Sequence, residues 1–143
     1  MQIGVETSRA VENKRIFVVD DDEIIRAAIQ FMLHDENETH EVASLDAAFE
    51  KAKDWRPDLI ILSESVVRAN GVDVVERIKG TIPEVKVLVI VENVADGFGK
   101  VCVAAGANSF IAKPLRIEFV RQKVDVLMGR RKSLEMPLKV LNT

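Results

Sequence analysis

The chain alternates between short, continuously apolar segments and longer amphipathic ones, and this alternation restricts its possible folds more than any other feature. The apolar segments are the expected strands, at residues 16–20, 40–43, 59–62, 85–91 and 107–112. A continuous apolar run is typical of a strand that is covered on both faces. Strands of this kind, separated by helices, predict an α/β fold with a five-stranded, parallel, doubly wound sheet and helices on both faces.

The amphipathic segments are the expected helices, at residues 22–33, from Ser44 or Asp46 to about residue 55, at 72–79, roughly 94–105, and 117–128. In the first of them, Ile25, Ile29 and Leu33 recur at helical spacing. The segment at 94–105 contains Gly97 and Gly99, which lower helix propensity. These glycines either shorten their helix or make it mobile, and we favour shortening.

The composition fits one soluble domain and excludes several function classes. The length of 143 residues suits a single core, which we place at 14–129 between a leader at 1–13 and a tail at 130–143. A net charge of −3 argues against a nucleic-acid platform. Cys102 is the sole cysteine and cannot form an internal disulfide, which fits the cytoplasm. No apolar stretch reaches the roughly 20 residues of a membrane span.

The tail leaves two interpretations open. Its basic start, residues 130–132, is expected to be a solvated helix end, where cations suit the helix dipole. Beyond it, Leu134, Met136, Leu138 and Val140 alternate with more polar residues. That pattern fits a strand that docks on a partner or on the edge of the domain, and it equally fits a short linker.

Chemically distinctive residues follow the expected strands at their carboxyl ends. In a doubly wound sheet, ligands bind beyond these ends. The residues in question are Asp20, Asp21, Ser63, Val91 and Lys113. The acids and the lysine suggest two walls of a phosphoryl-transfer pocket. The expected strand at 59–62 lies between these walls in the sequence, and it ends in Ser63 where such a pocket would need its nucleophile.

Ordered segments at matching spacing carry a family resemblance. They are Val18-Val19-Asp20-Asp21-Asp22, Pro57-Asp58-Leu59-Ile60-Ile61-Leu62, Gly106-Ala107-Asn108-Ser109-Phe110 and Ala112-Lys113-Pro114. Over about residues 14–129 the chain resembles a response-regulator receiver domain of the flavodoxin-like, chemotaxis-receiver type. The resemblance implies strand order 2-1-3-4-5 and a role in two-component signalling rather than enzymatic catalysis.

The resemblance also implies site roles, and two of them meet unsuitable residues. In such receivers two acids and an acceptor aspartate hold Mg²⁺, while a hydroxyl and a lysine bind the phosphoryl oxygens. Asp20 and Asp21 match the acids, Lys113 the lysine, and Phe110 the aromatic that swings inward on activation. Ser63 stands at the acceptor position and Val91 at the hydroxyl position. The chain therefore resembles an atypical receiver that lacks its phosphoacceptor, a pseudo-receiver.

Elementary chemistry extends this prediction. A serine hydroxyl is un-ionised at neutral pH, and Ser63 has no neighbouring histidine to act as base. Two carboxylates attract Mg²⁺ only weakly, so no cofactor is required and weak Mg²⁺ binding at Asp20 and Asp21 is the most we expect. Lys113 is expected to form a salt bridge with one of these acids. Because side chains alternate along a strand, Glu64 should face away from Ser63 unless a bulge intervenes.

Three functions fit these residues. The chain is a degenerate receiver that acts through constitutive protein contacts, a phosphorelay receiver with an unusual acceptor, or a receiver fold repurposed for a small ligand. We favour the first, because the acceptor and hydroxyl residues are missing and no glycine-rich phosphate loop is present.

The expected partner is a protein: a histidine kinase, an output protein or a second receiver. One arrangement is a homodimer through the fourth expected helix, the fifth strand and the fifth helix. That face should carry Phe98, Lys100, Val101, Phe110, Ile117, Arg121 and parts of Val124 and Met128.

Overall fold

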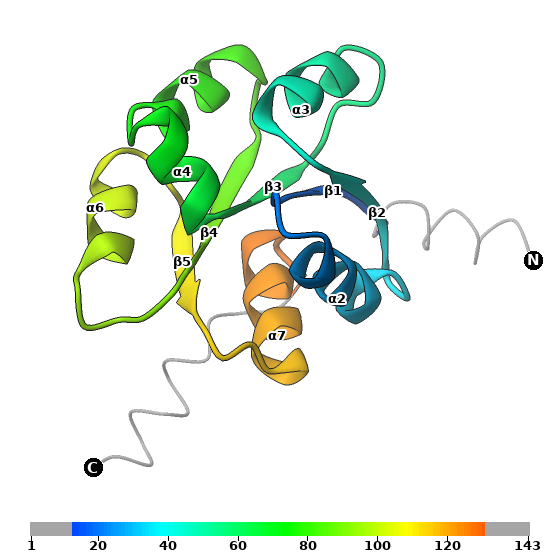
Figure 1. Cartoon of the computed structure of the whole chain (residues 1–143). Helices are drawn as coiled ribbons and strands as arrows, with labels where there is room; N and C mark the ends of the chain where they lie inside the picture. The colour runs from blue at the N-terminus through cyan, green and yellow to red at the C-terminus, as the bar shows by residue number, and fades with distance from the viewer. Residues whose placement is uncertain (1–12, 131–143) are drawn as a thin grey trace, which may run out of the picture.

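Five parallel strands form one sheet in the order β2-β1-β3-β4-β5 (Figure 1). The computed structural model describes residues 13–130. The strands are β1 Lys14–Val19, β2 Asn37–Val42, β3 Leu59–Ser63, β4 Lys86–Val91 and β5 Ser109–Ala112. This confirms the predicted sheet and its order. The second strand begins three residues before its predicted start at His40, because the polar segment at 37–39 pairs with the first residues of β1.

Helices cover both faces of the sheet, as predicted. They are α2 Glu23–Leu33, α3 Leu45–Ala52, α4 Glu64–Asn70, α5 Val74–Thr81, α6 Phe98–Ala104 and α7 Ile117–Leu127. Figure 1 shows α2 and α7 on one face and the other helices on the opposite face. Along β1, Val18 packs with the α2 and α7 side, whereas Phe17 and Val19 pack with the α3 to α6 side. The strands are therefore buried on both faces, which explains their uninterrupted apolar sequence.

The region after β3 differs from the prediction of one helix at 72–79. It contains two short helices, α4 and α5, and the missed helix α4 begins directly after Ser63. The Ser63 hydroxyl accepts a hydrogen bond from Val66 N at 3.3 Å and so caps the first turn. Gly71 ends α4 with a φ of 92°, in the region that favours glycine. The Asn70-Gly71 signal therefore separates two helices instead of preceding one.

Helix α6 is shorter than the predicted segment at 94–105. It begins at Phe98, because Gly97 takes a left-handed φ of 77° at the N-cap position. The favoured interpretation, that glycine shortens this helix, is confirmed for Gly97. Cys102 lies fully buried on α6, where it packs as a small core residue.

The leader and nearly all of the tail lie outside the described residues, so both interpretations of the tail stay predictions. At the boundary, Arg130 pairs with Asp125 at 3.0 Å. Within residues 13–130, no helix has the length and apolar character needed to cross a membrane.

Candidate functional site

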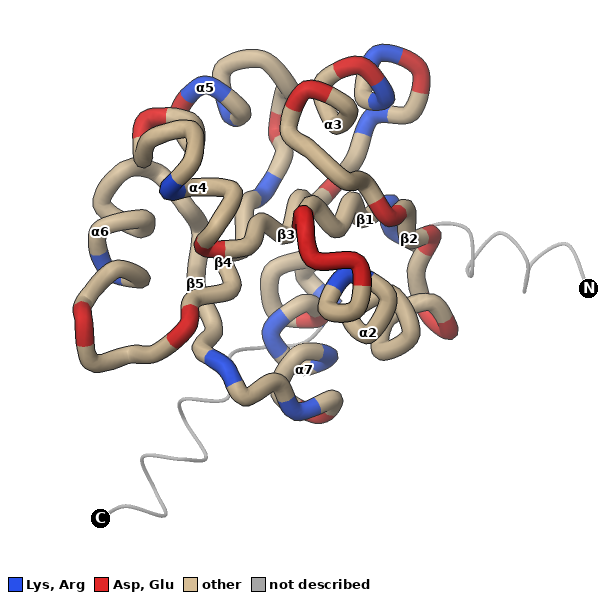
Figure 2. The backbone as a smooth tube through the Cα atoms, in the orientation of Figure 1, with Lys and Arg blue, Asp and Glu red and all other residues tan. Residues whose placement is uncertain are grey.

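The acidic side of the site lies at the carboxyl end of β1, where Figure 2 shows consecutive acids leading into α2. Asp20 is only 3% exposed, and one of its carboxylate oxygens accepts a hydrogen bond from Asp22 N at 2.9 Å. Burial raises the pKa of the Asp20 carboxyl above its ordinary value, and the hydrogen bond from Asp22 opposes that shift. Asp22 caps α2 by accepting from Ile24 N and Ile25 N. Asp20 and Asp22 thus serve local structure.

Ser63 lies at the end of β3, and its hydroxyl is already engaged. Its Oγ lies 3.0 Å from the Oγ of Ser65, in addition to capping α4. Ser65 in turn donates to a carboxylate oxygen of Asp21 at 3.0 Å. Ser65, for which the sequence predicted no role, thus joins Ser63 on β3 to Asp21 after β1.

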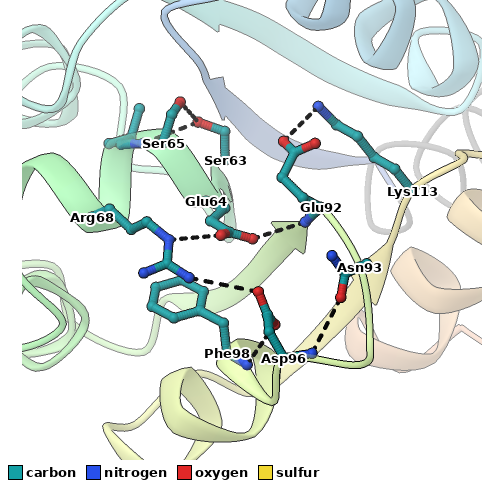
Figure 3. Close-up of polar contacts among 10 residues, drawn as sticks. Ser63, Glu64, Ser65, Arg68, Glu92, Asn93, Asp96, Phe98 and Lys113 are labelled. Carbon is teal, nitrogen blue, oxygen red and sulfur yellow. Dashed lines mark hydrogen bonds and ion pairs between the residues drawn. The ribbon is translucent and has the colours of Figure 1, made fainter.

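Glu64 points away from Ser63, as predicted, although it is the first residue of α4 and not part of the strand, and it enters a separate network (Figure 3). It is 6% exposed, although it carries a carboxylate. One oxygen accepts from Glu92 N at 2.8 Å and the other from Arg68 Nε at 2.6 Å. The sequence predicted no functional role for Glu64. A signal was available, because an acid at the end of a buried strand with arginine four residues later favours a helical ion pair.

Lys113 does not contact Asp20 or Asp21, so the predicted salt bridge is wrong. Its Nζ donates instead to a carboxylate oxygen of Glu92 at 2.9 Å (Figure 3). Glu92 follows β4, the direct neighbour of β5, whereas β3 and β4 separate β1 from β5. Since adjacent strands lie about 4.8 Å apart, Glu92 is the nearer carboxylate.

Val91 and Phe110 belong mainly to the apolar interior. Val91 is fully buried at the end of β4 and offers no side-chain donor. Phe110 is half-buried and packs against the same core, with its ring against Gly99 of α6. Val91, at the position where the resemblance predicts a hydroxyl, is therefore part of the core.

The site thus holds two adjacent acids, two linked serine hydroxyls and a lysine paired with glutamate. In residues 13–130, no group of three or more His, Cys, Asp or Glu side chains is arranged to hold a metal ion. The remaining donors toward Mg²⁺ would be Asp20 and Asp21, of which Asp20 is largely desolvated.

Comparisons with known proteins identify the family. A model described as the response regulator receiver domain matches residues 16–125. The chain belongs to the response regulator receiver family. This receiver domain has the parallel flavodoxin-like fold of the family and is a module of two-component signalling. Most of these curated relatives are named as response regulators, one carries an enzymatic name, and the family model matches the chain over its receiver domain.

Individual relatives agree with this assignment. The receiver domain is 32% identical over 76% of its length to protein-glutamate methylesterase/protein-glutamine glutaminase 1 of Methanospirillum hungatei, covering 33% of that protein. It is 30% identical over 69% of its length to the response regulator protein VraR of Staphylococcus aureus, covering 49% of it. The crystal structure of the NtrX receiver domain of Brucella abortus matches with 27% identity and a TM-score of 0.73, covering 81% of this chain and 99% of that one. The chain therefore spans a third to a half of these curated relatives.

Several residues expected on the contact face of the receiver domain lie elsewhere. Phe98 is 8% exposed and Val124 is fully buried, so neither contributes appreciable surface. Arg121 Nε donates to the backbone oxygen of Met32 at 2.8 Å, which directs Arg121 toward α2. Of the expected residues, Lys100 and Val101 are exposed.

Two exposed apolar residues that the prediction missed lie toward the β5 edge. Val103 on α6 is 41% exposed and follows Gly99, which faces Phe110 of β5, by one helical turn. Phe119 on α7 is 55% exposed. It precedes Arg121 by two positions, and residues so spaced do not share a helix face, so Phe119 points away from α2.

Proposed function

We propose that this receiver domain is not switched by phosphorylation and acts through constitutive contacts with a protein partner. The observation that carries the proposal is the state of Ser63, which stands at the acceptor position. Its hydroxyl caps α4 and contacts Ser65, and it supplies no anionic nucleophile. A buried, unpaired Cys102 agrees with a cytoplasmic location for the domain.

The phosphoryl-binding groups support the same proposal. A phosphoryl group would have to displace Glu92 from Lys113, because the two form an ion pair at 2.9 Å. Val91 offers no hydrogen bond to a phosphoryl oxygen. With one carboxylate missing, Asp20 and Asp21 would hold Mg²⁺ weakly at most. Each of these features lowers the stability of a phosphorylated state.

A phosphodonor experiment tests the proposal directly. The full chain is incubated with acetyl phosphate and Mg²⁺, and its intact mass and peptide masses are recorded. We expect no added phosphoryl group. A phosphoryl mass shift on Ser63, or on any other residue of the site, would contradict the proposal.

The same experiment tests a second candidate function, a phosphorelay receiver with an unusual acceptor. Ser65 suggests it, because its exposed hydroxyl donates to a carboxylate. Its Oγ lies 3.0 Å from an oxygen of Asp21, a distance at which a base can accept a proton. A phosphorelay receiver with an unusual acceptor would then carry its phosphoryl group on Ser65. A mass shift located there, and lost in Ser65→Ala, would favour this alternative.

The proposed contact surface is formed by α6, the β5 edge and α7, with Val103 and Phe119 as exposed apolar residues. A histidine kinase, an output protein or a second receiver would suit it, and a second copy of this chain is the simplest to test. We expect light scattering to show association that does not change with acetyl phosphate. Phe119→Ser should weaken it, while Phe31→Ser removes an exposed aromatic residue from α2 and serves as the control. Equal effects of the two variants would contradict a face at the β5 edge.

A further inference from the structure

The loop between β4 and α6, residues 92–97, has no helix or strand of its own, yet α4 holds both of its ends (Figure 3). At the first end, Glu92 N donates to the carboxylate of Glu64 at 2.8 Å. At the second, Arg68 Nη2 lies 3.7 Å from an Asp96 carboxylate oxygen. The loop is therefore attached to one short helix through two side chains.

Arg68 connects these attachments. It donates from Nε to Glu64 at 2.6 Å, and its guanidinium carbon lies 3.9 Å from the ring centre of Phe98 at the start of α6. The arginine thus contacts an anchor on its own helix, an acid in the loop and an aromatic residue of the next helix. A bonded, stacked guanidinium is more restricted than a free surface arginine.

Contacts inside the loop carry this restraint onward. Asp96 N donates to the side chain of Asn93 at 3.2 Å, and Phe98 N donates to Asp96 at 3.0 Å. The acid that Arg68 contacts therefore also positions the first residue of α6. Because Phe98 opens that helix, the restraint reaches the start of the proposed contact surface.

The same network reaches the site through Glu92. Its backbone is held by Glu64, while its carboxylate pairs with Lys113 after β5. One residue therefore connects α4 to both β4 and β5. A change at Glu64 should alter the loop and the position of the carboxylate that occupies Lys113.

We propose that Glu64 and Arg68 form a built-in lock that sets the conformation of the β4–α6 loop and thereby of the contact surface. The lock takes the place of an external trigger, and this inference rests on the proposed function. Glu64 is suited to the role because it is a buried carboxylate whose two oxygens bind one backbone amide and one guanidinium. Removing it leaves both donors without an acceptor.

Amide hydrogen exchange of the full chain, followed by NMR, tests the lock. The variants are Glu64→Met and Arg68→Met, which remove the charged groups and keep an unbranched side chain. The control is Glu50→Met. It removes an exposed glutamate of α3 that forms a surface ion pair with Lys53. The amides of Glu92, Asp96 and Phe98 are the reporters, and amides of β1 give the reference for global stability.

In either lock variant we expect the reporter amides to exchange on the order of tenfold faster, after correction for the reference amides. The control should leave them unchanged. Arg68 is half-exposed, so Arg68→Met still judges the lock if Glu64→Met does not fold. A corrected increase of less than about twofold in Arg68→Met would overturn the inference.

Different measurements would contradict the lock and the proposed function. The exchange experiment uses neither a phosphodonor nor an added partner, so it judges the lock by itself. Phosphorylation of the wild-type chain by acetyl phosphate would remove the proposed function without changing the exchange result. If the lock variants exchange faster and also associate differently in light scattering, both are supported together.

Discussion

Phe110 of β5 lies so close to Gly99 of α6 that no side chain fits between them. A Cβ atom at Gly99 would lie 2.3 Å from Cδ2 of the ring and 2.5 Å from two further ring carbons. Gly99 is buried within the helix, so its lack of a side chain is needed for packing and not for a turn. Gly97, in contrast, has a positive φ, and a Cβ atom added there would meet nothing within 4 Å.

Gly99→Ala should therefore destabilise the domain although alanine favours helices. Overpacking costs about 1–3 kcal/mol, which exceeds the gain of roughly 1 kcal/mol in helix propensity. Urea unfolding followed by circular dichroism measures the difference. Gly80→Ala on α5 is the matched control, since a Cβ there meets nothing within 4 Å. That control should stabilise the domain by up to about 1 kcal/mol.

The contact itself can be isolated with a double-mutant cycle. Phe110→Leu alone removes part of the aromatic ring and should cost about 1 kcal/mol, because the residue is only half-buried. In the Gly99→Ala/Phe110→Leu protein, the smaller side chain leaves room for the new methyl group. The double variant should be more stable than the sum of the single effects allows. Additive effects would mean that Phe110 does not limit position 99.

Asp20→Asn should stabilise the domain at neutral pH by about 1 kcal/mol, because it replaces a buried carboxylate beside Asp21. An asparagine oxygen can still accept the hydrogen bond from Asp22 N. Thermal unfolding measures the change. Asp54→Asn, which alters an exposed aspartate, is the control and should change stability by less than about 0.5 kcal/mol.

The pH dependence of that gain has a definite sign. Burial raises the pKa of Asp20 in the folded state, so as pH rises the unfolded state loses this proton at a lower pH than the folded state does. In the wild-type protein, protonated Asp20 contributes to the free energy of unfolding below the pKa of the unfolded state. This contribution is lost as pH rises through the raised pKa of the folded state. The advantage of Asp20→Asn should therefore grow over that window and vanish in acid. An advantage that is larger in acid would show that ionisation of Asp20 does not cause it.

The sequence was sufficient for the sheet but not for the connections within the site. Apolar runs such as 59–62 predict buried strands because both faces are covered, and strand ends then bring Asp20, Ser63 and Lys113 to one edge. The partner of Lys113 depended on which carboxylate lies nearer in the folded sheet. Glu92 directly follows Val91 in the sequence, and its ion pair with Lys113 is a tertiary contact without a local sequence signal.

Helix α4 shows a second limit of sequence patterns. Its seven residues are too few for a clear helical periodicity, and its N-cap is the same Ser63 that was considered as a degenerate acceptor. Ser63 was considered only for its place in the site, and its role as the N-cap of α4 was missed. Because aspartate is also a good N-cap, Ser63→Asp should preserve α4.

Three substitutions should together give the domain a site for a phosphoryl-like ligand. Ser63→Asp supplies the missing carboxylate and Val91→Thr the missing hydroxyl. Glu92→Ala frees Lys113 from its present partner, while the Glu92 backbone amide can still donate to Glu64. We expect the triple variant to bind beryllofluoride with Mg²⁺ roughly tenfold more tightly than the Ser63→Asp/Val91→Thr protein. The reason is that the Glu92 carboxylate no longer competes with the ligand for Lys113. Titration followed by ¹⁹F NMR measures both affinities.

Lys113→Met in the triple background is the control and should abolish most of the binding, because it removes the cation that the triple variant set free. Equal affinities of the double and triple proteins would mean that Glu92 does not compete for Lys113 in solution. If no variant binds, then Asp20 and Asp21 do not act together with Lys113 on one ligand. The three proteins therefore separate two obstacles to phosphoryl binding that the proposed function assumes, a missing nucleophile at position 63 and a lysine that Glu92 occupies.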